Sequence, residues 1–212
     1  MGSTRRPLAE RSESRSSRFD RWARTYERDP VSRFIAGPQN EALRSLELDS
    51  ADRFCDVGCG TGAAVRNAAM VASRAVGVDA SVEMVGRAEQ LAGDSRNATF
   101  VAGDATRLPF ADGAFTAVLC TTSFHHYADP RAAAREIGRV TAAAGRLALG
   151  DGVSDRLIVR VLDLVAGILE RSHVAFQRSP GLVQLFEAAG FTDIRVRTQW
   201  FGGYALLTGR KA

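Results

Sequence analysis

The stretch Arg53-Phe-Cys-Asp-Val-Gly-Cys-Gly-Thr-Gly62 decides the fold class. Its first five residues form a short, largely apolar segment, which predicts a buried strand. Three glycines, Gly58, Gly60 and Gly62, come next at every second position. Glycines at this spacing permit a tight turn and let a ligand approach the backbone where a helix begins. The Ala-rich residues after Gly62 predict that helix. Because Gly58-x-Gly60-x-x-Ala63 also satisfies the loose dinucleotide fingerprint, the loop alone does not identify the ligand.

Strand-like and helix-like segments alternate along the rest of the chain. Strands are predicted at residues 75–78, 98–102, 114–121 and 146–149, and a closing hairpin at residues 194–200 and 204–208. The predicted helices include one from Asp129-Pro130 to Gly145, an apolar one at 157–169, and an early one interrupted at Gly37-Pro38. This alternation predicts a mostly parallel sheet with helices on both faces, and such sheets bind ligands at the carboxyl ends of their strands.

Three carboxylates lie where predicted strands end. Asp56 precedes the first glycine by two residues, and a carboxylate there would repel the pyrophosphate of a dinucleotide. Asp79 ends the second strand, where it can accept hydrogen bonds from ribose hydroxyls. Asp104 follows the third strand, where an adenine amino group can donate to it. Three carboxylates without an evident phosphate-binding arginine favour a cationic, phosphate-free adenosine cofactor over NAD.

The composition is that of a soluble globular protein. The chain has 212 residues, of which 45% are hydrophobic and 25% charged, and this excludes collagen-like, low-complexity and disordered classes for most of it. No apolar run approaches the roughly 18 residues of a membrane span. Since no secretory signal follows Met1, a cytoplasmic protein is expected. The three cysteines match neither a disulfide framework nor a zinc pattern, and no metal is expected.

Basic residues are concentrated at the N-terminus. Residues 1–33 hold 9 of the 28 Lys and Arg but 5 of the 24 acidic residues, and this excess of four equals the net charge of +4. The Ser/Arg-rich residues 1–16 predict a disordered basic arm. Phe19, Trp22 and Tyr26 recur at helical spacing and predict a short helix after it. A solvated tail is the simpler interpretation of the arm, and contact with nucleic acid is the alternative.

Four motifs follow one another in a specific order. They are Asp56-Val-Gly-Cys-Gly-Thr-Gly62, Gly77-Val-Asp-Ala-Ser81, Gly103-Asp-Ala105 and Phe124-His-His-Tyr-Ala-Asp-Pro130. In combination they resemble class I S-adenosylmethionine-dependent methyltransferases, in the branch that contains the ubiquinone- and menaquinone-biosynthesis enzymes. The resemblance implies a Rossmann-like α/β fold: a seven-stranded, mostly parallel sheet with helices on both faces and the last strand antiparallel. It also implies one methyltransferase domain at residues 17–212, with a helical cover at 17–48.

The resemblance further implies S-adenosyl-L-methionine as the cofactor and assigns residues to it. The first acidic residue and the glycine loop face the methionine moiety, the second acidic residue holds the ribose, and the third holds the adenine. The cofactor-binding residues so implied are Tyr26, Asp56, Gly58, Gly60, Gly62, Asp79, Ala80, Met84, Asp104, Ala105 and Thr121. Purely structural roles stay open for four of them. Asp79 and Asp104 can cap a helix or a turn, Met84 can be a core residue, and Tyr26 can belong to the aromatic stripe.

The histidine pair after the fourth strand is the candidate catalytic group. Either His125 or His126 can act as a base if the methyl acceptor must lose a proton, and ordering of the loop before Asp129 is the structural alternative.

Missing signatures narrow the acceptor. Residues 121–124 replace the Asn/Asp-Pro-Pro-Tyr motif of amino-group nucleic-acid enzymes, Cys120 lacks the preceding proline of pyrimidine C5 enzymes, and no acidic pair follows the fourth strand. Metal-free transfer to a small molecule is therefore predicted. The alternatives are an RNA methyltransferase that uses the basic arm, and a non-catalytic S-adenosylmethionine-binding protein.

Overall fold

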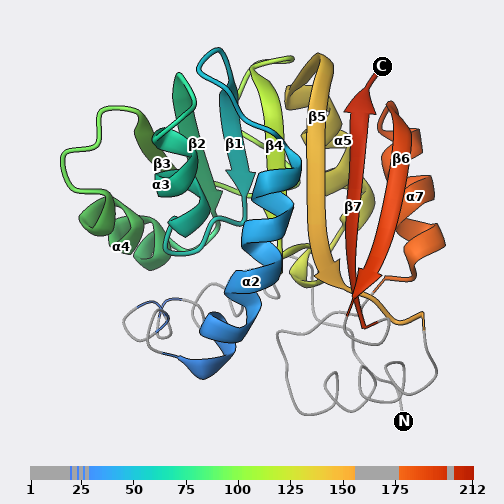
Figure 1. The fold of residues 1–212 in the computed structure, drawn as a ribbon, viewed down its shortest axis with the longest axis horizontal. Coiled ribbons are helices and arrows are strands. Elements are labelled where there is room, and N and C mark those ends of the chain that lie inside the picture. The colour runs from blue at the N-terminus through green and yellow to red at the C-terminus, as the bar shows by residue number, and fades with distance from the viewer. Residues whose placement is uncertain (1–19, 21–22, 24–25, 27–28, 156–176, 200–202) are drawn as a thin grey trace, which may run out of the picture.

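The computed structural model describes residues 20, 23, 26, 29–155, 177–199 and 203–212. Its centre is a seven-stranded sheet in the order β3-β2-β1-β4-β5-β7-β6 (Figure 1). The strands are β1 (Arg53–Val57), β2 (Arg74–Asp79), β3 (Ala98–Ala102), β4 (Phe115–Thr121), β5 (Thr141–Gly152), β6 (Phe191–Gln199) and β7 (Tyr204–Lys211). The strands β1 to β5 pair in parallel, whereas β7 is antiparallel to both of its neighbours, β5 and β6. The predicted Rossmann-like sheet with its antiparallel last strand is confirmed.

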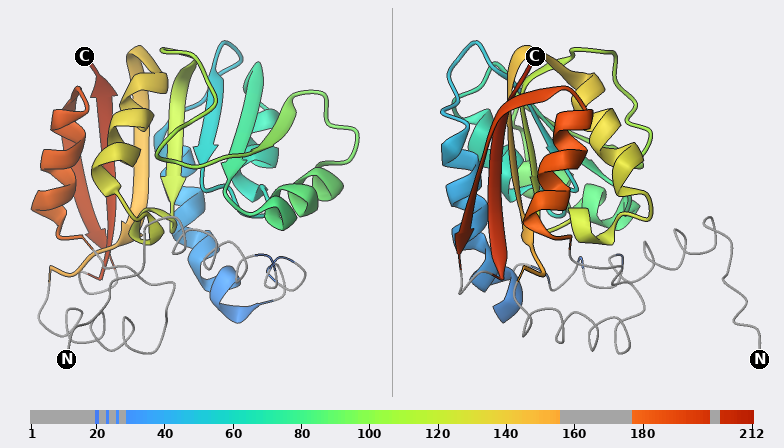
Figure 2. Two further views of the ribbon diagram at one scale, coloured as in Figure 1. Left: turned by 180° about the vertical axis from the view of Figure 1, so that it is seen from behind. Right: turned by 90° about the vertical axis from the view of Figure 1, so that its right-hand side faces the viewer.

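Helices cover both faces of this sheet. They are α2 (Pro30–Ser45), α3 (Ala63–Ala69), α4 (Val82–Ala92), the 3-10 turn η2 (Phe124–His126), α5 (Pro130–Val140) and α7 (Ser179–Ala188). Seen edge-on, α2 lies on the opposite side of the sheet from α5 and α7 (Figure 2). The predicted arrangement of helices on both faces is thus confirmed.

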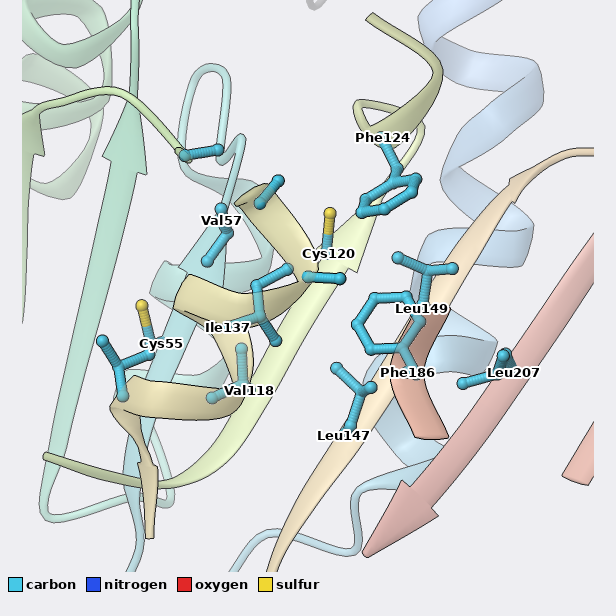
Figure 3. Packing of buried hydrophobic residues seen from close by; sticks show 14 of the residues in the cluster. Cys55, Val57, Val118, Cys120, Phe124, Ile137, Leu147, Leu149, Phe186 and Leu207 are labelled. Carbon is cyan, nitrogen blue, oxygen red and sulfur yellow. The ribbon is translucent and has the colours of Figure 1, made fainter. Parts of the chain in front are cut away.

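Each face of the sheet has its own hydrophobic core, because successive strand residues point to opposite faces. On the face covered by α2, α3 and α4, Leu46 and Val65 join a cluster that includes Phe54 of β1. On the other face, Ile137 of α5 and Phe186 of α7 pack with strand residues that include Val118, Leu147 and Leu207 (Figure 3). Burial on both faces makes this sheet a rigid platform for the loops at its edge.

The loops that follow β1, β2, β3 and β4 leave the same edge of the sheet, at the bottom of Figure 1. The helix α2 begins beyond this edge and runs up across the face of β4 and β5. Glu41 of α2 accepts hydrogen bonds from Arg197 (2.8 Å) and Gln199 (2.6 Å) of β6, which tie the helix to the far side of the sheet. The carboxyl edge therefore gathers the loops that the sequence marks as ligand-binding.

The predicted end of the fifth helix at Gly145 is wrong. The helix α5 ends at Val140, and β5 begins at Thr141, which pairs with Phe115 of β4. The pairing register then shifts before Arg146, and Ala144 within this stretch has a φ of 59°. Alanine favours helix, but pairing with the neighbouring strand outweighs that local preference here.

The predicted break at Gly37-Pro38 is also wrong, because α2 continues through Pro38. A proline inside a helix removes one backbone hydrogen bond, and helices that pack well survive this loss. Ala42 and Leu46, which are 0% and 1% exposed, hold the following turns of α2 against the sheet.

Some predicted segments lie outside the described residues, namely the basic arm at 1–16 and the apolar helix at 157–169. The N-terminal cover at 17–48 is described at residues 20, 23 and 26 and from 29 onward. Within the described ranges, no helix has the length and apolar character needed to span a membrane.

Candidate active site

The glycine loop after β1 forms the centre of the site. Gly58, Gly60 and Gly62 have φ values of 81°, 52° and 77°, a backbone region that favours glycine. A Cβ on Gly58 would lie 2.4 Å from the hydroxyl of Ser123, whereas a Cβ on Gly60 would have no atom of the described residues within 4 Å. The loop is thus closed against the protein at Gly58 and open at Gly60. This open backbone is where a ligand can approach.

Asp56 is a buried carboxylate just below the loop. Its side chain is 3% exposed, and its Oδ1 has no hydrogen-bond partner among the described residues. Burial, and then the negative charge of Asp79, raise the pKa of Asp56 to about 8. An unpartnered carboxylate oxygen in a buried position is costly, so this site favours a ligand that brings a donor or a positive charge.

Asp79 connects the first two loops at the carboxyl edge. Its carboxylate accepts hydrogen bonds from the backbone N–H groups of Gly60 (2.8 Å) and Ser81 (2.9 Å). Burial raises the pKa of Asp79, and these backbone hydrogen bonds lower it in part. Ala80 beside it is exposed, while Ser81 caps α4 by accepting from the N–H of Met84. Asp79, which the sequence predicts to bind the ribose, therefore lies next to the glycine loop.

The predicted adenine residues are placed less tightly. Asp104 is exposed, and its Oδ1 accepts from the N–H and the hydroxyl of Thr106, both at 2.8 Å. Ala105 is buried in the core, and Met84 is 1% exposed in α4. The N–H of Gly103 donates to the backbone carbonyl of Asp79 (2.9 Å), which brings the third loop beside the second. The geometry of Asp104 fits a turn cap as well as an adenine contact.

The loop after β4 contacts the glycine loop through Ser123 and Tyr127. Both hydroxyls donate to the carbonyl of Val57 at 3.2 Å, and they lie 3.1 Å from each other. Thr121, which ends β4, is buried, and Thr122 after it has a φ of 54°. A left-handed backbone is unusual for a β-branched residue, and such strain clusters at functional sites.

The two predicted catalytic histidines lie in η2 of this loop. Their rings are 3.9 Å apart between centroids. Nδ1 of His125 lies 2.6 Å from the carboxylate of Asp151, whose side chain is 2% exposed. The backbone N–H of His126 donates to the carbonyl of Ser123 (2.9 Å). The histidine pair is therefore held by Asp151 of β5 through His125, and by Ser123, which contacts Val57 before the glycine loop, through His126.

The N-terminal cover reaches the site at Asp20. The hydroxyl of Ser81 donates to Asp20 (2.5 Å), so this part of the cover lies against the loop after β2. Tyr26 is partly buried, and its carbonyl accepts from the N–H of Asp29 (3.2 Å). The predicted contact between Tyr26 and the cofactor stays a prediction.

The three cysteines are buried, and the direction of their pKa shifts argues against a nucleophilic role. Burial raises the pKa of the Cys55 and Cys59 thiols well above the ordinary value and raises that of Cys120 to about 12. A thiol with so high a pKa is protonated at neutral pH and therefore weakly reactive.

Sequence analysis missed several residues of this site. They are Asp20, Ser123, Tyr127 and Asp151. A signal was present for Asp151, since it follows the predicted strand at 146–149 by two residues and β5 runs parallel to β4. An acidic residue at the carboxyl end of a fifth parallel strand belongs to the same edge as Asp56 and Asp79.

Comparisons with known proteins agree with this geometry. Residues 55–149 match a methyltransferase domain family. The chain is 32% identical to a demethylmenaquinone methyltransferase of Mycolicibacterium vanbaalenii, over 93% of this chain and 94% of that protein. The chain belongs to the class I S-adenosylmethionine-dependent methyltransferases.

Two solved structures share the fold of this methyltransferase. YcgJ of Bacillus subtilis has a TM-score of 0.70 at 23% identity, over 82% of this chain and 97% of its own. Magnesium protoporphyrin IX methyltransferase of Synechocystis PCC 6803, solved with bound S-adenosylhomocysteine, has a TM-score of 0.71 at 24% identity, over 96% and 99%.

The residues present fit S-adenosylmethionine, which is the cofactor of this family. Oδ1 of Asp56, which has no partner in the described part of the chain, suits the ammonium group of its methionine part, and the open backbone at Gly60 suits close approach. The carboxylate of Asp79 is held at the carboxyl edge of the sheet, where it can accept hydrogen bonds from ribose hydroxyls. The roles of the single residues stay predictions.

Proposed function

We propose that this methyltransferase transfers the methyl group of S-adenosylmethionine to a small-molecule acceptor without a metal ion, and that the acceptor is a quinol of the demethylmenaquinone type. The observation that supports the cofactor is the buried Asp56 oxygen, which has no hydrogen-bond partner among the residues that the structure describes, beside the open glycine loop. The acceptor is inferred from the relative that matches nearly the whole chain.

When bound, the cofactor supplies a methyl group that is already activated by attachment to a positively charged sulfur. The residues of the chain therefore need to bind, orient and exclude water, and this alignment provides most of the acceleration. Asp56 holds the methionine part of the cofactor and Asp79 its ribose, and the Gly60 side of the loop leaves room for it among the described residues. A Lewis acid has no evident task in such a transfer, which is the basis for proposing a metal-free reaction.

The acceptor meets the cofactor on the side of the loop after β4. A quinol is a better nucleophile than the oxidised quinone, so the reduced form of the acceptor is the reactive one. Its ring gives up a proton when the methyl group is added. The pair His125 and His126 lies in this loop, and one of the two takes that proton.

The test is to incubate the purified enzyme with methyl-labelled S-adenosylmethionine and chemically reduced demethylmenaquinone, and to follow the product by mass spectrometry. A product that gains the labelled methyl group, at an unchanged rate in excess chelator, supports the proposal. Loss of activity in chelator, restored by added metal, contradicts the metal-free part.

A second arm replaces the quinol with a metabolite extract, and a third with bulk RNA. A labelled metabolite other than the quinol contradicts the proposed acceptor but keeps small-molecule transfer. Labelled RNA favours the alternative that uses the basic arm, and its binding should then fall steeply with salt. Tight cofactor binding without any labelled product indicates a non-catalytic protein.

A further inference from the structure

Asp151 makes three hydrogen bonds at the carboxyl end of β5. Oδ2 accepts from the backbone N–H of His125 (2.8 Å), while Oδ1 accepts from the backbone N–H of Gly152 (2.7 Å) and lies 2.6 Å from Nδ1 of His125. The side chains of Asp151 and His125 are 2% and 11% exposed. The carboxylate thus grips His125 at two points, one on its backbone and one on its ring.

This grip fixes which ring nitrogen carries the proton. An ionised carboxylate only accepts hydrogen bonds, so Nδ1 of His125 must be the donor. In the neutral ring Nε2 is then the acceptor, and a proton transfer by this ring takes place at Nε2. A carboxylate that holds the tautomer and orientation of a histidine base is a recurring device in enzymes.

The surrounding loop places His125 between the cofactor side and β5. Thr122, strained at a φ of 54°, donates its N–H to the carbonyl of Gly150 (2.7 Å), one residue before Asp151. Ser123 contacts the carbonyl of Val57, directly before the glycine loop. His125 follows Ser123 by two residues, so its backbone leaves the contact with Val57 of β1 and its ring reaches Asp151 of β5.

We propose that Asp151 is a positioning residue that makes Nε2 of His125 the general base of the methyl transfer, and that the acceptor therefore bears an acidic proton on a hydroxyl group or an activated ring carbon. The proposal rests on the proposed function for its reaction. It selects His125 over His126, because the carboxylate is bonded to the former.

The step is balanced without a further reactant. The acceptor's proton passes to Nε2, its electron pair forms the bond to the methyl carbon, and the electrons of the broken carbon–sulfur bond stay on sulfur, which becomes neutral. The imidazolium then returns its proton to solvent. Asp151 keeps its charge throughout and stabilises the imidazolium while it exists.

The first measurement is the tautomer of His125 in the enzyme labelled with ¹⁵N-histidine, and it needs no acceptor. The chain has three histidines, so His125→Gln and His126→Gln assign the signals. At a pH where the ring is neutral, we expect His125 with its proton on Nδ1, and a shift toward the other tautomer in Asp151→Asn. An Nδ1 that is unprotonated in the unaltered enzyme would overturn the proposal.

The second measurement is the rate with reduced demethylmenaquinone. Both His125→Gln and Asp151→Asn should lower kcat by about 10²-fold or more, the usual contribution of a placed base, whereas KM and the Kd for S-adenosylhomocysteine change by about twofold at most. His126→Gln should lower kcat less than His125→Gln does, and an equal or larger loss in His126→Gln would contradict the choice of His125. Equal losses of rate and cofactor affinity in Asp151→Asn would show a merely structural residue and contradict the proposal.

Asp52→Asn is the matched control. Asp52 is also a buried carboxylate with three hydrogen-bond donors, namely the N–H of Asp49, the hydroxyl of Thr116 and the guanidinium of Arg146, but it precedes β1 at the opposite edge of the sheet. Its loss should destabilise the protein without changing the tautomer of His125 or kcat.

The two measurements separate this proposal from the proposed function. If the quinol is not methylated but the tautomer is as expected, the acceptor assignment fails, and the rate test moves to the acceptor found in the metabolite extract. If the quinol is methylated at the same rate by His125→Gln, the proposed function holds and the base assignment fails.

Discussion

Asp56 lies one residue before the end of β1 and Asp79 ends the neighbouring parallel strand β2, and the negative charge of Asp79 adds to the burial that raises the pKa of Asp56 to about 8. Two buried carboxylates without a cation between them destabilise a folded chain. The Asp56 carboxyl is the more costly of the two, because its Oδ1 lacks a partner in the described part of the chain, whereas Asp79 accepts two backbone hydrogen bonds. We infer that stability is exchanged here for cofactor recognition.

The cofactor-free enzyme should lose stability as the pH rises through the range from 3.8 to about 8. Asp56 has a higher pKa folded than unfolded, so the folded chain holds more protons in this range, and the free energy of unfolding then falls with pH. Asp56→Asn should flatten this dependence and raise stability at the upper end. Urea unfolding of both proteins across the window measures the effect.

The same variant should bind the cofactor more weakly, by about 1–3 kcal/mol, because a charged acceptor for the ammonium group is lost. Calorimetry with S-adenosylhomocysteine gives this value. A variant that is more stable but binds as tightly as the unaltered enzyme would remove Asp56 from the cofactor site.

Asp79→Ala should weaken cofactor binding by at least ~1–3 kcal/mol, because the ribose hydroxyls lose a charged acceptor. The N–H groups of Gly60 and Ser81 lose theirs as well, so the glycine loop is less well held. Calorimetry measures this loss, and NAD should bind to neither protein. Tight NAD binding by the unaltered enzyme would contradict the adenosine-cofactor assignment.

Gly58→Ala should destabilise the enzyme by more than about 2 kcal/mol, since it combines a positive φ with a buried clash. The new Cβ would lie 2.4 Å from the hydroxyl of Ser123 at a φ of 81°. Gly37→Ala is the control: it lies in α2 with nothing within 4 Å of the new Cβ, so a gain of about 0.5–1 kcal/mol is expected. Thermal unfolding of both variants measures the difference, and equal effects would refute the close-approach argument.

Removal of residues 1–16 should leave activity intact, whereas a chain that begins at Pro30 should bind the cofactor more weakly. The second truncation removes Asp20, which accepts a hydrogen bond from Ser81, two residues after the proposed ribose-binding carboxylate Asp79. Cofactor affinity and activity of both truncations provide the measurement. Full activity of the chain from Pro30 would exclude a cover role for residues 17–29, and loss of activity on removing 1–16 would make the basic arm a binding element.

Sequence reasoning succeeded where one local pattern determines the structure. The strand before Gly58 and the carboxylates Asp56 and Asp79 follow from the alternation of strands and helices, which fixes the edge to which their loops belong. It failed where tertiary pairing decides, as at Thr141, where pairing with Phe115 ends α5 early. Asp151 was missed for a related reason, since flanking glycines make Gly-Asp-Gly read as a turn, although β5 continues through it.

Local reasoning also missed the hydrogen bonds that Ser123 and Tyr127 donate to the carbonyl of Val57. Ser123 and Val57 are 66 positions apart, and no spacing in the sequence links them. Such contacts depend on how β4 lies beside β1, which becomes visible only once the sheet order is known.

The position of β7 between β5 and β6 has a consequence for the order of assembly during synthesis. The strand β6 leaves the ribosome before β7, yet it pairs with β7 and not with β5, so it must wait for a strand made later. Asp151 pairs with Ala205 of that same late strand. The half of the sheet that carries the cofactor loops has no such wait, because β1 to β4 pair with one another. A nascent chain can therefore form its cofactor pocket before β5, the strand that anchors His125, has paired with β7.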